Sequence, residues 1–578
     1  MKRMYPYIRP WLWAMVAAIL FKGAGAVTDL LIPYMMGILI DTGIATGEAH
    51  QIVVMCLAML FLTLVTAGFN ILANFISARA TQKIGERIRN ALYSHIQKLT
   101  IKDVDRVETP SLITRVTNDV EHVQRTLLMM TRFMVRAPIM AIGGVCLSLM
   151  LDPVLTLVIF VGMILLGVAS MSVYKVTRPI YRRVQQAIDR LTTILREGLS
   201  GIRVIKSFNK SEYEINRFTS QSKEVKKHEL KAGLFNAYMD PSIGLITNMT
   251  IAVVLFCSGF RVEAGALEIG KIFAIVNYIN MILNAMTRIP RMFMMFSRAN
   301  TSSARIAEIL DIEESTEYGK ADDRKCENTV LEFRDVSFAY PGSPANSLKH
   351  VSFKVKKGET LAVIGATGSG KTTLQNLILR LYEPSEGSIR FEGRDIREYS
   401  KRALNRMVTA AMQQYTIFGM TIRDNIILDQ DFEEDRLERS ARSAQIMDLI
   451  DELDDHFEYE IAQNGTNLSG GQKQRISVAR TLYRQADLTI LDDVSSALDY
   501  RTDLRLRSAL RRNYKGKAVL LISQRISSVR GADQILVLEK GTAVGLGTHE
   551  ELLRNCEAYR DICRTQAVEV PEGGECHA

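Results

Sequence analysis

The first half of the chain consists of long apolar runs separated by charged stretches, and the second half lacks such runs. A helix of about 20 apolar residues is long enough to cross a bilayer. Six segments reach that length, at about 11–40, 52–77, 127–151, 153–176, 241–260 and 270–296. The pattern predicts an all-α transmembrane domain with six spanning helices over residues 1–310.

The connections between these segments alternate in length and charge. Residues 78–123 and 177–238 are long and rich in Lys and Arg, whereas residues 41–50 and the turn at Asp152-Pro153 contain neither. Positive loops stay in the cytoplasm. We therefore expect a multi-pass protein of the cell membrane with both termini, both long loops and the second half in the cytoplasm.

The two long loops keep the periodicity of helices. Ile84, Ile88 and Leu92, for example, recur at spacings of four. The spanning helices are therefore expected to continue well beyond the bilayer, with turns near residues 103–111 and 209–217. Polar helices of this length usually bridge to another domain, and solvated hairpins without a partner are the alternative.

Charged and amide side chains interrupt some of the apolar segments. Lys22 and Asp29 lie seven residues apart on one predicted helix face, Arg288 and Arg291 flank Pro290, and Asn277, Asn280 and Asn284 share a sector of the last segment. Such groups can line a polar pathway or form hydrogen bonds between helices. The sequence favours neither role.

Composition adds little to this pattern. The net charge of +9 could indicate nucleic acid, but the basic residues of the first half gather in particular loops, so membrane topology explains them better and no nucleic-acid partner is expected. Seven cysteines are scattered without the spacing of a metal site, which favours reduced thiols at a cytosolic face.

A polar linker at 311–328 leads into a soluble α/β domain at 329–568, followed by a tail at 569–578. Residues 330–333 and 336–340 are expected to be strands that end at Pro341-Gly342. Tyr340 would then lie at a strand end, where its ring could stack on adenine. Packing in the core is the alternative.

One stretch of this domain carries a specific chemical signal. The apolar run Leu361–Ile364 predicts a strand, and a helical pattern begins at Lys371. The loop between them fits GxxxxGK[ST], in which backbone N–H groups surround phosphates, the lysine reaches the β- and γ-phosphates and the threonine hydroxyl binds Mg²⁺. The expected ATP-binding residues are Gly365, Ala366, Thr367, Gly368, Ser369, Gly370, Lys371, Thr372 and Thr373.

Three further elements fit the same ATP site. Gln413 can offer a side-chain carbonyl to Mg²⁺ or to a water. Ser469, Gly470, Gly471 and Gln472 open a helix whose start can bind an anion, and because the P-loop already occupies one phosphate face, this start is expected to serve another face of ATP or another subunit's ATP. Asp492 ends an apolar strand and suits Mg²⁺, together with Thr372 and Gln413, while Asp493 would face the attacking water.

These motifs, with Ser496-Ala497-Leu498-Asp499 and the six preceding segments, resemble an ATP-binding cassette (ABC) exporter half-transporter over about residues 10–565. The resemblance implies a dimer in which two cassettes enclose two ATP molecules. Each ATP then lies between one chain's P-loop and the other's Ser469–Gln472 segment. It also implies that the turns near 103–111 and 209–217 are coupling helices, the second of which reaches the partner's cassette.

The sequence departs from the family at two catalytic positions. Members that hydrolyse ATP carry Glu at the position of Asp493 and His at that of Gln524, and residues 461–465 also differ from the usual sequence. Two concerted changes resemble the degenerate-site subunit of a bacterial heterodimeric multidrug-type exporter, which moves lipophilic or amphipathic small molecules or lipids with ATP and Mg²⁺. The alternatives are a homodimeric lipid or peptide exporter with slow ATPase activity, and an ATP-gated channel or regulator.

Overall fold

The computed structural model describes residues 4–313, 318–322, 328–343, 345–495 and 498–566, without the side chains at 170, 173–174, 178, 236, 239–240, 287–294 and 500. The chain forms two compact units. One comprises Met1–Gln97 and Thr109–Ile312, and the other comprises Lys98–Glu108 and Glu313–Ala578. The side chains of Arg288, Pro290 and Arg291, as well as Ser496 and Ala497, lie outside the described residues.

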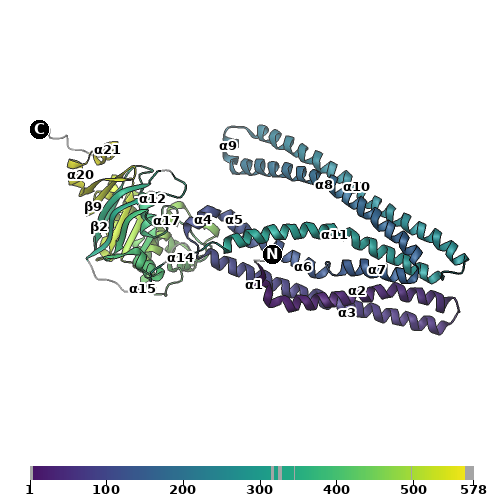
Figure 1. The fold of residues 1–578 in the computed structure, drawn as a ribbon. Helices are drawn as coiled ribbons and strands as arrows, with labels where there is room; N and C mark the ends of the chain where they lie inside the picture. The colour runs from purple at the N-terminus through teal and green to yellow at the C-terminus, as the bar shows by residue number, and fades with distance from the viewer. Residues whose placement is uncertain (1–3, 314–317, 323–327, 344, 496–497, 567–578) are drawn as a thin grey trace. The chain divides into compact units, whose positions relative to one another are not determined.

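The first unit is helical (Figure 1). Its elements are α1 (Tyr5–Ile8), α2 (Leu12–Ile38), α3 (Ala49–Ile96), α5 (Thr109–Thr114), α6 (Val120–Arg132), α7 (Arg136–Leu151), α8 (Pro153–Ser200), α9 (Ile202–Ser207), α10 (Ser211–Glu263) and α11 (Ile269–Leu310).

Five helical segments among the described residues are long and apolar enough to cross a membrane: Tyr5–Ile44, Ala49–Ile96, Thr109–Leu151, Pro241–Glu263 and Ile269–Met286. A shorter apolar stretch at Pro153–Ala169 begins α8. Asp152 starts that helix by accepting hydrogen bonds from the backbone N–H groups of Val154 and Leu155. Each of the six predicted segments therefore lies in helical structure, apart from the turn at 133–135 between α6 and α7 in the third segment.

Helices α8 and α10 run side by side well beyond their apolar stretches (Figure 1). The prediction of a turn at residues 209–217 was wrong in its position. The chain reverses between Gly201, which ends α8, and Asn209, whose φ of 52° lies in the left-handed region. Residues 211–217 already belong to α10, because Glu212 and Glu214 in its first turn favour helix formation there.

The second unit contains two sheets. An antiparallel sheet has the order β2-β1-β4-β5, and the other has the order β10-β9-β3-β8-β7-β6, with all but β10 parallel to their neighbours. The strands are β1 (Thr329–Phe338), β2 (Leu348–Lys356), β3 (Thr360–Ile364), β4 (Glu386–Phe391), β5 (Arg394–Asp395), β6 (Val408–Ala411), β7 (Leu488–Asp492), β8 (Ala518–Ser523), β9 (Gln534–Glu539) and β10 (Thr542–Gly547).

The prediction of two strands at 330–333 and 336–340 was wrong in detail. They form the single strand β1, which keeps pairing with β2 across an irregularity between Phe333 and Val336. Tyr340 lies two residues beyond its end. An irregular pair of residues inside a strand looks like a turn in the sequence because the apolar alternation is interrupted there.

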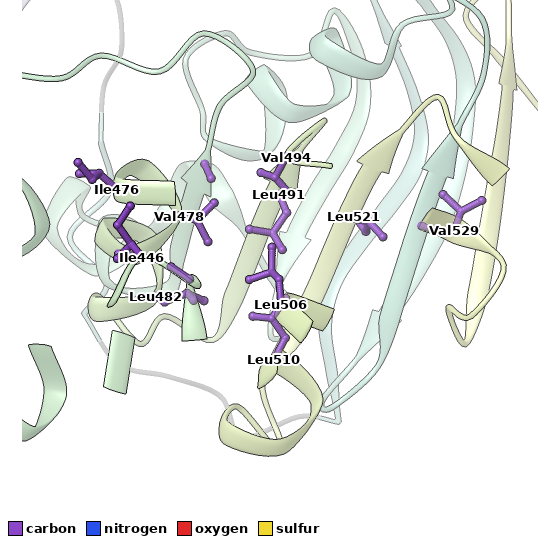
Figure 2. Close-up of a cluster of buried hydrophobic side chains, with 14 of the residues drawn as sticks. Ile446, Ile476, Val478, Leu482, Leu491, Val494, Leu506, Leu510, Leu521 and Val529 are labelled. Carbon is purple, nitrogen blue, oxygen red and sulfur yellow. The ribbon is translucent and has the colours of Figure 1, made fainter. Parts of the chain in front are cut away.

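The helices of the second unit are α4 (Ile101–Val107), α12 (Lys371–Ile378), α13 (Lys401–Met407), α14 (Ile422–Ile427), α15 (Glu434–Ser443), α16 (Met447–Glu452), α17 (Gly470–Tyr483), α18 (Tyr500–Asn513), α19 (Ile526–Val529), α20 (His549–Asn555) and α21 (Glu557–Thr565). Figure 2 shows one of its cores, in which Leu491 and Leu521 of the parallel sheet lie beside Leu506 and Leu510 of α18. This packing fixes β7 and β8, whose ends carry the candidate catalytic residues.

Two connecting segments pack onto this unit. Helix α4 comes from the first long loop, and its Asp105 accepts a hydrogen bond from the hydroxyl of Tyr382. Within the predicted linker, Gly319 donates its N–H to the carbonyl of Arg397, and Ala321 forms a bridge with Tyr399. The domain boundaries at 310, 328 and 568 stay a prediction.

Candidate ATP-binding site

Three neighbouring parallel strands end at the edge of the sheet where the candidate residues lie. Ile364 of β3 pairs with Ser523 of β8, and Ile522 of β8 pairs with Asp492 of β7. Carboxyl ends of parallel strands meet at one edge, which is where α/β proteins bind ligands. The P-loop therefore converges with the two aspartates and Gln524, although it precedes all three by more than a hundred residues in sequence.

The P-loop needs its glycines for close approach and for backbone conformation. A Cβ at Gly365 would lie 2.2 Å from the carbonyl oxygen of Leu538, and Gly370, with φ of 104°, precedes the first residue of α12. Such a loop presents N–H groups and a helix start to an anion. The hydroxyl of Ser369 is buried and has no hydrogen-bond partner among the described residues, as expected of a cradle built for a ligand.

Lys371 at the start of α12 folds back onto the loop. Its Nζ donates hydrogen bonds to the carbonyl oxygens of Gly365 at 2.7 Å and Ala366 at 2.8 Å. Burial lowers the pKa of Lys371 from its ordinary value, and the charges of Asp492 and Asp493 oppose this shift. A phosphate would accept hydrogen bonds from this ammonium with a full negative charge, in place of the two neutral carbonyl oxygens.

A cleft of about 610 Å³ opens beside the loop. Its described lining contains Ser343, Ala345, Asn346, Ser347, Lys349, Thr367, Gly368, Gly370, Lys371, Thr372, Thr373, Gln413, Asp492, Asp493, Ile522, Ser523, Gln524 and Lys540. Gly365, Ala366 and Ser369 belong to the loop behind this lining. The structure thus brings most of the predicted ATP-site residues to one cleft, and the role of each residue stays a prediction.

Asp492 is a buried carboxyl group of the cleft with a perturbed pKa. Burial raises its pKa to about 6, and repulsion by Asp493 adds to this, while a backbone N–H from Gln413 and the charge of Lys371 act in the opposite direction. An acidic group held without a full counter-charge is suited to a cation. The Asp492 carboxylate, the Thr372 hydroxyl and the Gln413 amide oxygen offer hard oxygen ligands of the kind that Mg²⁺ prefers.

Hydrogen bonds hold the backbones of Asp493 and Gln524, the two residues that differ from the family pattern. Asp493 has φ of 48°, donates its N–H to the carbonyl of Ile522 at 2.8 Å, and accepts a hydrogen bond from the side-chain amide of Gln474. Gln524 accepts a hydrogen bond at its backbone carbonyl from Gln566 at 2.7 Å. Both residues line the cleft that contains Lys371.

Tyr340 lies outside this lining, in an aromatic cluster. Its ring packs edge-on against Phe338 and Tyr382, and its hydroxyl accepts a hydrogen bond from Asn376 at 3.2 Å. These contacts agree with the alternative role of Tyr340, in which its ring packs in the core. Stacking on adenine stays a prediction.

The segment Ser469–Gln472 also lies outside the lining of the cleft. Ser469 caps α17 in a capping box, since its hydroxyl accepts the N–H of Gln472 while the Gln472 side chain accepts the N–H of Ser469 at 2.7 Å. Ser469 and Gly470 are exposed. This chain therefore carries a well-ordered, exposed helix start away from its own P-loop cleft, available to an anion.

Sequence reasoning missed part of the site. The cleft is also lined by Ser347, Lys349 and Lys540. They lie together because the N–H of Lys349 donates a hydrogen bond to the carbonyl of Gly541, which joins the β9–β10 turn to β2. Gln474, whose side-chain amide donates a hydrogen bond to the carbonyl of Asp493, lies two positions after the Ser469–Gln472 segment. Its polar side chain on the buried face of α17 was the available signal.

The comparisons with known proteins agree with this architecture. The family model described as ABC transporter transmembrane region matches residues 15–286, and that described as ABC transporter matches residues 348–496. The chain is similar to an uncharacterized ABC transporter ATP-binding protein, YfiB, of Bacillus subtilis, with 34% identity over 569 residues and 98% of each chain covered.

Two further similarities are informative. The ATP-dependent lipid A-core flippase of Pectobacterium atrosepticum is 29% identical over 567 residues, covering 98% of this chain and 97% of the flippase. The solved structure of a bacterial Atm1-family ABC exporter with ATP bound has a TM-score of 0.78 at 20% identity, covering 98% and 99% of the two chains, which shows a shared fold. The chain therefore belongs to the ABC transporter family, as a half-transporter in which a helical transmembrane region and an α/β ATP-binding domain share one polypeptide.

Proposed function

We propose that this chain is one half of a heterodimeric ATP-driven exporter. In this proposal its own P-loop site binds ATP but hydrolyses it slowly, and its Ser469–Gln472 segment completes the hydrolytic site of a different partner chain. The observation that carries the proposal is that Asp493 and Gln524 line the same cleft as Lys371. These are the two positions at which hydrolysing relatives are expected to carry Glu and His.

Asp493 in place of Glu and Gln524 in place of His are expected to weaken proton transfer more than they weaken ATP binding. An aspartate is one methylene shorter than a glutamate, so its carboxylate lies roughly an ångström farther from a water that must be held within about 3 Å. A glutamine can donate a hydrogen bond to a γ-phosphate but cannot carry a proton as imidazole does. Asp493 and Gln524 are therefore expected to slow hydrolysis.

Binding of MgATP does not depend on those two side chains. The loop glycines, the Lys371 ammonium and the orphaned Ser369 hydroxyl can hold the phosphates, and Asp492, Thr372 and Gln413 can hold Mg²⁺. The bound metal would supply positive charge to the phosphates. The site then works as a stable nucleotide clamp between the two cassettes.

The intact helix start supports an unequal pair of sites. Ser469 keeps both hydrogen bonds of its capping box, and the exposed N-terminal end of α17 offers N–H groups and the positive end of the helix dipole to a phosphate. Such a surface would have no use if both sites were weak. A partner with the usual Glu and His would use it for hydrolysis.

The proposed substrate is a lipophilic or amphipathic molecule that moves outward, with both termini and the cassette in the cytoplasm. The length of α8 and α10 supports an exporter-type arrangement in which cytoplasmic helical extensions transmit motion. The resemblance to a lipid A-core flippase supports a lipid-like substrate.

A homodimer with slow ATPase activity is the second candidate, because the Asp493 carboxylate still faces the cleft and could act as a weak base. ATPase activity of the chain purified alone and with its co-purified partner separates the two proposals. We expect ATPase activity only when the partner is present. We also expect Lys371→Ala to weaken nucleotide binding at this chain's own site. Ordinary exporter rates from this chain alone would favour the homodimer, and nucleotide binding without any ATPase activity in either form would favour the gated channel or regulator.

A further inference from the structure

Four ionisable side chains lie close together in the first unit, on three of its helices. Lys22 and Asp29 belong to α2, Arg132 ends α6 and Arg136 begins α7. Arg132, Arg136 and Asp29 all lie near enough to Lys22 for their charges to act on it. The group therefore holds three cations and one carboxylate.

The carboxylate is already committed. Asp29 accepts a hydrogen bond and ion pair from the Arg136 guanidinium at 2.7 Å, so α2 is joined to α7. The Lys22 ammonium donates instead to the neutral side-chain oxygen of Asn70 on α3, also at 2.7 Å. Among the described residues, the buried Nε of Arg132 has no hydrogen-bond partner. Two positive charges thus lack an acidic partner in the described part of the unit.

The surroundings make this imbalance unusual. Lys22 is only 7% exposed, and the whole group lies within helical segments apolar enough to span a membrane. Charged side chains in such segments are rare, usually paired, and found on pathways for charged substrates. A structural tie between helices would need only the Asp29–Arg136 pair and the Lys22–Asn70 hydrogen bond, which leaves Arg132 unexplained.

A break in the helix lies at the same place. Helix α6 ends at Arg132 and α7 begins at Arg136, so the two arginines flank residues 133–135. A Cβ added at Gly23, next to Lys22, would lie within 4 Å of Val135 and Ile139. Interrupted helices at membrane depth occur where the backbone is buried in protein or lines a polar cavity.

The cluster is open on the side of α7. The side chain of Arg136 is 39% exposed and that of Asp29 18%, whereas Lys22 is buried. Arg132 and Arg136 carry planar guanidinium groups, which match phosphate and carboxylate oxygens. Lys22 lies about 16 Å along its helix from the start of the apolar segment, at roughly 1.5 Å per residue, so a bound head group would be well inside the bilayer.

Building on the proposed transport function, we infer that this cluster of Lys22, Arg132, Arg136 and Asp29 binds the anionic head group of a membrane amphiphile. The occupant is a lipid-like molecule with a phosphate or carboxylate, taken from the membrane half nearer the cytoplasm. The head group supplies the negative charge that Lys22 and Arg132 lack, and its apolar chain stays among the spanning helices. This assigns an acidic, amphipathic substrate class to the transporter.

The test is direct binding to the full-length protein in nanodiscs of neutral lipid, without nucleotide. Lysophosphatidic acid and lysophosphatidylcholine with the same acyl chain are compared, so that the apolar part is constant while the head group changes from anionic to zwitterionic. The variants are Lys22→Gln and Arg132→Gln, with Lys22→Arg to retain the charge. Lys271→Gln is the matched control, because Lys271 lies in the same unit on α11 and pairs with Glu268.

We expect the original protein to bind lysophosphatidic acid at least tenfold more tightly than lysophosphatidylcholine. Lys22→Gln and Arg132→Gln should each lose most of that preference, and Lys22→Arg and Lys271→Gln should keep it. Equal binding of the two lipids, an unchanged preference in both glutamine variants, or full competition by inorganic phosphate would overturn the inference. Because nucleotide is absent, a negative result here leaves the ATPase proposal standing, and a failed ATPase proposal leaves this binding result intact.

Discussion

The hydroxyl of Tyr382 donates a 2.6 Å hydrogen bond to the carboxylate of Asp105, which joins α4 to the ATP-binding domain. Burial raises the pKa of Tyr382 above its ordinary value, and the hydrogen bond to Asp105 contributes. The Tyr382 ring also packs against Tyr340 and Phe338. A residue of the first long loop is therefore fastened to the aromatic cluster that lies next to the nucleotide-binding sequence.

Tyr382→Phe should weaken communication through α4 while leaving nucleotide binding intact. The lost hydrogen bond contributes about 1 kcal/mol in a typical case, and exposure of Asp105 reduces that value, so we expect a decrease of about two- to fivefold in substrate-stimulated ATPase activity. The matched control is Tyr399→Phe, whose hydroxyl donates to the carbonyl of Phe391 within the same domain. Equal effects of the two variants on stimulation would contradict a coupling role.

Asp492 should make the stability of the nucleotide-free protein depend on pH near 6. Its pKa of about 6 lies above the ordinary value, so the folded state binds this proton more readily than the unfolded state. The resulting stability is fully present below the unfolded pKa and is lost as the pH rises through about 6. Asp492→Asn should therefore stabilise the protein at pH 8 by about 1–3 kcal/mol and reduce the pH dependence.

Thermal unfolding of both proteins between pH 5 and 8 measures this difference. Asp561→Asn is the control, because Asp561 is an exposed carboxyl group in a long ion pair with Arg564. A pH dependence that is the same in Asp492→Asn and in the original protein would show that the carboxyl group is not perturbed. Mg²⁺-dependent ATP binding should weaken as the pH falls through 6, since the metal requires the ionised carboxylate.

Ser469→Ala should damage stability and activity for separate reasons. Loss of the N-cap costs about 1 kcal/mol. Loss of the hydroxyl at the partner's ATP should also abolish most ATPase activity of the complex. Thr548→Ala is the matched control because Thr548 caps α20 in the same way. It should lower the melting temperature to a similar degree and keep ATPase activity, and a parallel loss of activity in both variants would assign the Ser469 effect to folding alone.

The turn between α8 and α10 is expected to contact the partner's cassette. A cysteine at Ser207 in α9, in a background without the native cysteines, should cross-link to cysteines placed on the partner's cassette. Thr192→Cys, on the exposed face of α8 about 12 Å before the turn at 1.5 Å per residue, should not. Exclusive cross-linking of Ser207→Cys to the cassette of its own chain would exclude the exchanged arrangement.

Sequence periodicity predicted the apolar helices, the P-loop strand and helix, and the helix after Ser469, because each is a long regular pattern or a motif with fixed spacing. It misplaced the second turn, since the helix-ending signals at Gly201 and Asn209 were weaker than the polar composition of residues 209–217. It also divided β1 at an irregularity. Contacts between distant segments, such as Tyr382 with Asp105 and Lys22 with Asn70, depend on packing that no local pattern records.

The most direct measurement of the central claim is the ATPase rate of the complex with one catalytic residue changed at a time. Loss of a well-placed general base costs about 10²- to 10⁴-fold in rate. We expect that replacing the partner's catalytic glutamate by glutamine nearly abolishes turnover, whereas Asp493→Asn in this chain changes it by less than about threefold. Hydrolysis by this chain alone, as a homodimer, at the rate of the complex and its loss with Asp493→Asn would contradict the heterodimer with unequal sites.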